Sequence, residues 1–170
     1  MSIAQSLLPE FDQEMAGTRK TLERIPADKF EWRPHEKSFT MIALASHITN
    51  MCGWGGMTIK ETSFDFAPVG GESYKEDLAA SVAELLEKFD QGAAEFRAAL
   101  AAASDADMMA EWSLLKGGAT VFSMPRVACL RGMIFNHIVH HRAQLGVYLR
   151  MNDVPVPALY GPSADEGDMF

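Results

Sequence analysis

Residues 136–150, with the sequence NHIVHHRAQLGVYLR, place three of the chain's five histidines within five residues of a helical pattern. An α-helix turns by about 100° per residue, so His137 and His141 point the same way and lie about 6 Å apart along the axis. Two imidazoles with this spacing can bind one metal ion. His140 is displaced by about 60° from His137 and by about 100° from His141, so it fits the same ion poorly.

A third histidine, His47, lies at the edge of the apolar face of MIALASHITNM, residues 41–51. A bundle helix that buries a histidine must give the ring nitrogens partners. Two histidines of a facing helix that share an ion with His47 would do so. The alternative is a core histidine bonded to a neighbouring carbonyl. The zinc-protease pattern H-E-x-x-H is absent, because Ile138 follows His137.

Outward from these stretches, apolar residues recur at three- and four-residue steps and predict four amphipathic helices. We expect the first helix at about residues 2–24 and the second from Ser38 or Thr40 to the GWGG at 53–56. The third should begin with a capping box at Ser73–Glu76 and end near Ser104. The fourth should span about 124–151, with Ser123 as its cap. Residues 62–71 read as a long connection, and the tail after residue 152 is expected to wrap the surface. A Gly-Gly pair in EWSLLKGGATVF, residues 111–122, predicts a small hairpin or an irregular loop.

The composition is that of one globular domain spanning residues 1–170, with 48% hydrophobic and 22% charged residues. The net charge of −8 is spread along the chain and argues against nucleic acid as a partner. No apolar run reaches the roughly 18–20 residues that span a bilayer, and no signal peptide is evident, so a cytoplasmic protein is expected. Cys52 and Cys129 lie in apolar helical patterns, which favours buried free thiols over a disulfide.

Three stretches carry a resemblance to a known family: WRPHEKSFTMIALASHI at 32–48, NHIVHHRAQLGVYLR at 136–150 and VPVPALYGPSADE at 154–166. Together they resemble the bacterial DinB (DNA-damage-inducible) family of metal-binding four-helix-bundle proteins, the DinB/YfiT-like metalloenzymes. The resemblance spans nearly the whole chain, and the HHR-x-Q motif of the last helix is its most specific part. It implies an all-α, up-up-down-down four-helix bundle, often paired into a homodimer. It also implies that His47, His137 and His141 bind one divalent ion.

Residues around this triad are further candidates for the site. Gln144, three residues after His141, could hydrogen-bond a ligand imidazole, or it could be an ordinary polar helix position. Trp54, Trp112 and His140 are candidates to line a pocket, with core packing as the alternative for the tryptophans. Arg142 is expected to form a surface or inter-helix ion pair. No residue stands out as a general base, and the catalytic residue is not identified.

Three neutral imidazoles leave at least one coordination position open, as in catalytic sites. Zinc, nickel or iron would suit these ligands, and each lowers the pKa of a bound water or thiol. The resemblance implies an S-transferase that uses a low-molecular-weight thiol and acts on a small-molecule substrate. Two alternatives stay open: a metal-dependent hydrolase, and a non-catalytic metal-binding protein linked to stress.

Overall fold

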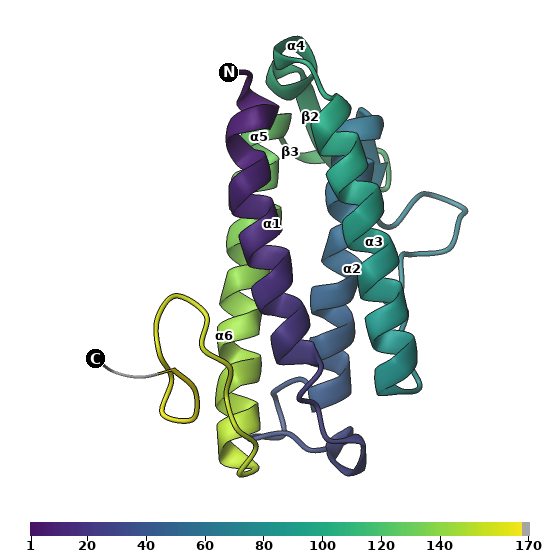
Figure 1. Cartoon of the computed structure of the whole chain (residues 1–170). Coiled ribbons are helices and arrows are strands. Elements are labelled where there is room, and N and C mark those ends of the chain that lie inside the picture. The colour runs from purple at the N-terminus through teal and green to yellow at the C-terminus, as the bar shows by residue number, and fades with distance from the viewer. Residues whose placement is uncertain (168–170) are drawn as a thin grey trace.

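The computed structural model describes residues 1–167, most of which are helical (Figure 1). Four long helical segments lie side by side, and shorter elements connect them. The long segments are α1 (Ile3–Leu22), α2 (Met41–Lys60), α3 (Val82–Ala102) and a C-terminal run of α5 (Arg126–Cys129), the π-helical η2 (Leu130–Phe135) and α6 (Asn136–Met151). The shorter elements are η1 (Ala27–Lys29), β1 (Ser63–Asp65), α4 (Asp105–Met109), β2 (Glu111–Lys116) and β3 (Ala119–Pro125).

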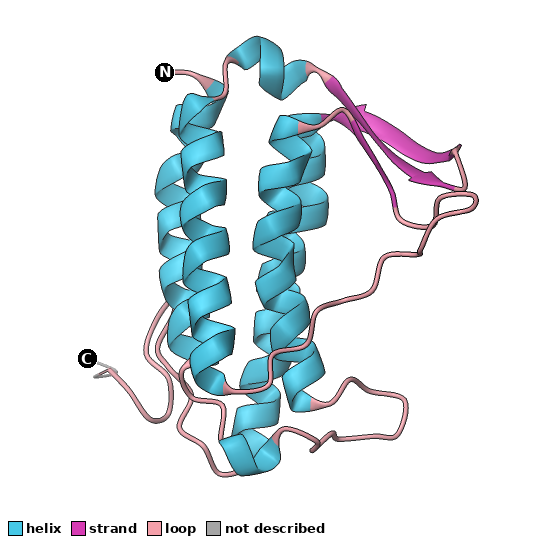
Figure 2. Ribbon diagram, turned by 90° about the vertical axis from the view of Figure 1, so that its right-hand side faces the viewer, coloured by secondary structure: helices cyan, strands magenta, loops and turns pink. Residues whose placement is uncertain are grey.

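The directions of the four segments follow from contacts between them. Ion pairs join Glu10 to Arg131 and, further along both segments, Glu14 to Arg142, so α1 and the C-terminal run are parallel. The connection between α1 and α2 stays at one end of the bundle, whereas residues 61–81 return along its length before α3 begins (Figure 2). In the view of Figure 1 the order is therefore down, up, up, down, which differs from the expected up-up-down-down. Connection lengths alone do not determine these directions.

The third helix begins later than expected, and the predicted capping box at Ser73–Glu76 does not form. α3 starts at Val82, where the Ser81 side chain accepts a hydrogen bond from the Glu84 amide. Residues 72–80 instead run irregularly beside α2, where the Ala79 amide donates to Ser46 Oγ over 3.1 Å. The sequence SVAE at 81–84 carries the same Ser-x-x-Glu signature, and the helix begins at this second motif.

The predicted hairpin is confirmed, but it belongs to a three-stranded sheet that the all-α expectation lacked (Figure 2). Gly117 and Gly118 form its turn with φ values of 60° and 76°, a conformation that side-chain-bearing residues rarely adopt. Strand β1, from the predicted connection, pairs in parallel with β2, and Ser63 faces Ser113. The Asp65 carboxylate accepts hydrogen bonds from both turn glycines and so ties β1 to the hairpin.

Two other helix boundaries also differ from the expectation. Helix α2 continues through GWGG to Lys60. The glycines let α3 pack closely against it, since a Cβ on Gly55 would lie 2.2 Å from the Phe96 ring. The last helical run begins at Arg126, close to the expected start at about 124, but Ser123 does not cap it. Ser123 lies in β3, where its hydroxyl bonds that of Ser113 over 3.0 Å.

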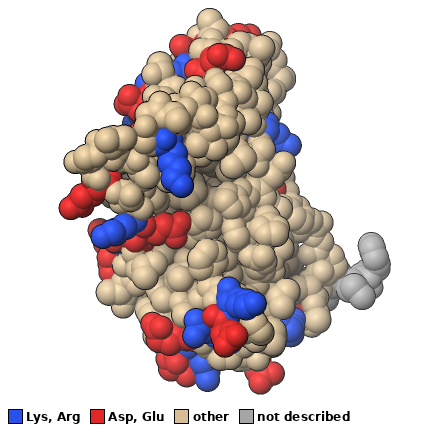
Figure 3. Space-filling model, turned by 180° about the vertical axis from the view of Figure 1, so that it is seen from behind, with Lys and Arg blue, Asp and Glu red and all other residues tan. Residues whose placement is uncertain are grey.

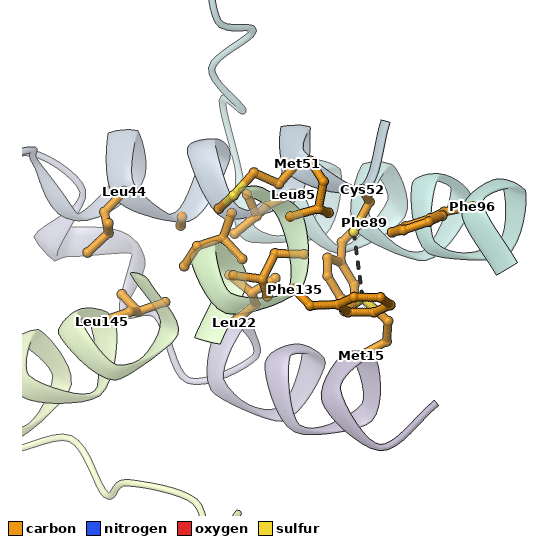
Figure 4. Close-up of a cluster of buried hydrophobic side chains, with 14 of the residues drawn as sticks. Met15, Leu22, Leu44, Met51, Cys52, Leu85, Phe89, Phe96, Phe135 and Leu145 are labelled. Carbon is orange, nitrogen blue, oxygen red and sulfur yellow. Dashed lines mark hydrogen bonds between the residues drawn. The ribbon is translucent and has the colours of Figure 1, made fainter. Parts of the chain in front are cut away.

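The core lies between the long helices and is rich in aromatic and aliphatic side chains (Figure 4). The Phe11 ring packs edge-on against Phe96 with centroids 4.9 Å apart. Cys52 and Cys129 are free and buried, as predicted. Burial raises the pKa of the Cys52 thiol to about 12, and its sulfur lies 3.8 Å from that of Met15 (Figure 4).

The tail packs against the bundle, as expected, through polar contacts with α1 and α6. The Tyr160 hydroxyl donates to the Glu14 carboxylate, and Glu166 pairs with Arg24. Arg142 forms the expected inter-helix ion pair, with Glu14 of α1, but the pair is buried rather than exposed. None of the helices in residues 1–167 is long and apolar enough to cross a membrane. On the face shown in Figure 3, basic side chains are interspersed with acidic ones.

Candidate metal centre

Three histidines converge between α2 and α6. His47 projects from the middle of α2, and His137 and His141 project from successive turns of α6. The Nε2 atom of His137 lies 3.4 Å from that of His47 and 2.8 Å from that of His141. His47 is only 8% exposed. The structure therefore brings together the three side chains that the sequence singled out, and they could hold one metal ion.

The second nitrogen of each ring has an acceptor. These acceptors are a Glu76 carboxylate oxygen for His47, Gln144 Oε1 at 2.7 Å for His141 and the Met133 carbonyl at 3.3 Å for His137. Because these oxygens can only accept hydrogen bonds, each Nδ1–H acts as the donor and each Nε2 keeps its lone pair. The partners thus determine which nitrogen faces the centre of the triad.

This donor set fits a divalent metal ion. Lone pairs that face one another at 2.8–3.4 Å without a proton between them repel, and a cation bound to all three would remove that repulsion. Metal–nitrogen bonds of about 2.0–2.1 Å in a tetrahedral arrangement would place the nitrogens about 3.3 Å apart. The His47–His137 distance of 3.4 Å matches this value, and the His137–His141 distance of 2.8 Å is shorter.

The protonation state of the imidazoles also suits metal binding. Burial lowers the pKa of His137, and the neighbouring His47 ring lowers it further. Burial lowers the pKa of His141 to about 4, although the hydrogen bond from its ring to Gln144 raises it. Both rings are therefore neutral at pH 7, and the neutral imidazole is the form that binds a metal.

The triad lies beside an apolar cavity of about 180 Å³, which His137 helps to line. Of the three predicted pocket residues, Trp54 and Trp112 line it, whereas His140 does not. The Trp54 ring also packs edge-on against His47, with centroids 5.4 Å apart. A second hollow, a groove of about 380 Å³, is lined by residues that include Lys37 and His141. The triad thus borders an apolar cavity at His137 and a more polar groove at His141.

Three further polar side chains, those of His140, Gln144 and His35, do not belong to the triad. The His140 ring packs edge-on against that of His141, with centroids 4.9 Å apart, but its Nε2 lies 3.1 Å from the Gln144 side-chain nitrogen and does not join the triad. Gln144 contacts His141 through its oxygen, so it can orient that ring. His35 accepts a hydrogen bond from the Lys37 amide within its own loop and contacts no part of the triad.

Sequence reasoning missed Glu76 and Phe39. Glu76 was predicted to be part of a helix-capping box, and no local pattern relates it to His47, which is 29 residues away. Phe39 lies just before Thr40, the N-cap of α2, and its ring lies 5.7 Å from that of His47. Glu76 reaches the triad because its segment runs beside α2.

Changing Glu76 to Ala should weaken metal binding by about 10- to 100-fold, because the carboxylate holds His47 in the required tautomer and orientation. Glu76→Gln keeps an acceptor oxygen and should lose less. Exposed Glu72 lies in the same segment, and Glu72→Ala is the matched control. Competition with a chromogenic zinc chelator measures the affinities, and an unchanged affinity in Glu76→Ala would contradict this role.

Comparisons with known proteins agree with this architecture. In the solved structures, a DinB-like protein from Bacillus cereus is 21% identical, with a TM-score of 0.71 over 94% of this chain and 98% of that one. A DinB-like protein from Bacillus subtilis is 20% identical, with a TM-score of 0.68 over 91% and 96% of the two chains. No curated protein sequence matches this chain significantly. The family profile described as DinB superfamily matches residues 10–145, and the chain therefore belongs to the DinB superfamily.

Proposed function

We propose that this protein is a metal-dependent transferase that joins a low-molecular-weight thiol to a small electrophilic molecule. The observation that carries the proposal is the position of the triad: three Nε2 lone pairs converge between an apolar cavity and a more polar groove. Three ligands leave a coordination position open, as catalytic sites require. Zinc, nickel or iron would suit an all-imidazole set.

A bound divalent ion would supply Lewis acidity, which lowers the pKa of a thiol toward neutrality and makes the thiolate available. The chain's own residues prepare the site for this chemistry. His47, His137 and His141 bind, while Glu76 and Gln144 orient two of their rings. The aromatic rings of Phe39 and Trp54 pack against His47 and limit the access of water to it.

The thiol must come from outside the protein. Both cysteines are buried, and burial raises the pKa of each thiol, so neither is a ready nucleophile. In the proposed reaction a sulfur–carbon bond forms and the bond between that carbon and its leaving group breaks. The leaving group takes the electron pair of the broken bond, and the thiol proton leaves with it or enters the solvent.

Addition of a low-molecular-weight thiol to the cobalt-loaded protein should produce a sulfur-to-metal charge-transfer band. Glutathione, bacillithiol, mycothiol and coenzyme A are the probes, because the thiol is not identified. Apparent affinity should strengthen as pH rises toward the free thiol pKa, about 8.5 for a cysteine-like thiol, since binding requires loss of the proton.

The S-methyl derivative of each thiol is the matched control, because it cannot form a thiolate and should give no band. A spectrum unchanged by all four thiols at every pH would overturn the proposal. In that case, turnover of ester or amide substrates without added thiol would favour a hydrolase. Loaded protein that is inactive in both assays would favour a non-catalytic metal-binding protein.

A further inference from the structure

The apolar cavity beside the triad has walls from all three strands, from α2 and from the C-terminal run. Its aromatic wall residues are Trp54, Phe64, Trp112 and Phe122. His137 belongs both to the triad and to the cavity wall. A molecule in the cavity therefore lies next to the candidate metal centre.

The polar side-chain atoms in this wall are not available to a ligand. The Thr58 hydroxyl donates to the Trp54 carbonyl over 2.8 Å, and the Trp54 indole N–H donates to the Tyr74 hydroxyl over 3.1 Å. Both ring nitrogens of His137 are engaged, one with a backbone carbonyl and the other within the triad. The Nε1 atom of Trp112 is buried and exposes almost no surface to the cavity.

A polar group that entered this cavity would find only a weak partner. The remaining candidate is the Cys129 thiol, and a neutral thiol is a poor donor and acceptor. A hydroxyl, an amide or a charged group would lose its hydrogen bonds with water and gain none of similar strength. A hydrocarbon group has no such cost, so the wall selects against polar groups at this position.

The volume and the aromatic walls restrict the hydrocarbon further. An apolar cavity of about 150 Å³ engineered in another protein stays dry and binds benzene. The present cavity, at about 180 Å³, therefore has room for one six-membered ring with a short alkyl group. Aromatic walls favour an aromatic guest, because rings attract one another edge-on or offset.

We infer that this cavity binds an aromatic ring without polar substituents, and that this ring is the apolar end of the substrate. The inference rests on the proposed function in one respect, because it assigns the ring to the electrophile of the transfer reaction. The binding event itself requires neither thiol nor turnover. It can therefore be measured separately from the chemistry.

Toluene and phenol test the inference, since they have nearly the same shape and differ by a methyl or a hydroxyl group. Toluene should bind the zinc-loaded, full-length protein, and phenol should bind at least tenfold more weakly, because its hydroxyl finds no partner. NMR titration measures both affinities. Cobalt in place of zinc should broaden the signals of bound toluene, because the cavity adjoins the triad.

Three results with the wild-type protein would overturn the inference. They are failure of toluene to bind, phenol that binds as tightly as toluene, and bound toluene whose signals cobalt does not broaden. The first excludes the ligand site, the second excludes selection against polar groups, and the third places toluene away from the triad.

Leu114→Asn places an amide in the cavity wall and should reduce the preference for toluene to less than threefold. Leu115 follows it in β2 but does not line the cavity, and Leu115→Asn is the matched control that should keep the preference. An unchanged preference in Leu114→Asn would contradict the apolar wall as the cause of selection.

A second pair of variants covers the case in which Leu114→Asn does not fold. Leu114→Trp should fill the cavity and weaken toluene binding at least tenfold. Exposed Val121 on β3 does not line the cavity, and Val121→Trp should leave the affinity unchanged. Equal effects of the two variants would contradict the cavity as the binding site. If toluene binds here but no thiol gives a charge-transfer band, the transferase proposal fails and the ligand site stands.

Discussion

His137→Ala should lower the affinity for a divalent ion by more than a hundredfold, and His47→Ala and His141→Ala should do the same. The wild-type protein, purified without a nickel column, should bind one ion per chain. The three Nε2 atoms converge, so removal of one leaves two ligands. The binding free energy of a structural zinc site with four ligands is about 10–16 kcal/mol, which corresponds to roughly 3 kcal/mol for each ligand. Elemental analysis and chelator competition measure occupancy and affinity.

His140→Ala is the matched control, because His140 lies on the same turn and bonds Gln144 rather than the other imidazoles. Its affinity for the ion should stay within a few-fold of the wild type. Equal losses in His140→Ala and His141→Ala would show that a different pair of α6 imidazoles binds the ion. Full occupancy in His137→Ala would sink the assignment of the triad altogether.

Arg142→Ala should destabilise the folded protein by about 3–5 kcal/mol, because it leaves the buried Glu14 carboxylate without its counter-ion. The side chains of Arg142 and Glu14 are 3% and 8% exposed, with nitrogen and oxygen 2.6 Å apart. Arg142 also donates to the Glu14 carbonyl over 3.0 Å and to the Tyr160 hydroxyl. One substitution thus disrupts α1, α6 and the tail together. Urea unfolding followed by circular dichroism measures the loss.

Arg97 provides the matched control, since it forms a two-point ion pair with Asp12 on the surface. These side chains are 50% and 48% exposed, and Arg97→Ala should cost far less stability than Arg142→Ala, because exposed ion pairs contribute little. The double variant Glu14→Leu, Arg142→Met should recover much of the stability, because it removes both buried charges at once. A loss in Arg142→Ala no larger than that in Arg97→Ala would show that the buried pair does not stabilise the fold.

The sequence was informative where the signal is local. The repeat of apolar residues predicted the long helices, since a helix must bury one face whatever it packs against. The one-turn spacing of His137 and His141 follows from helix geometry, and so does the exclusion of His140. The paired glycines at 117 and 118 predicted the hairpin, because a tight turn requires their positive φ values.

The role of His47 depends on both local pattern and tertiary contacts. Its position on an apolar helix face left two interpretations open, a core histidine or a metal ligand shared with two histidines 90 and 94 positions further along the chain, and the resemblance to the DinB family favoured the second. The misplaced start of the third helix is a second such case. Ser73–Glu76 and Ser81–Glu84 carry the same capping signature, and only the first also supplies a carboxylate for His47.

The tertiary structure alone decided the surroundings of the triad. Strand β1 pairs with a strand 50 residues away, Glu76 reaches His47, and both contacts form because residues 61–81 return along the bundle. The cavity depends on five separate segments at once. Local propensity carries no record of such contacts, because their energy arises only when distant segments are packed together. The sequence by itself therefore determined the helices and the metal-binding residue type, and the packing decided what can bind beside them.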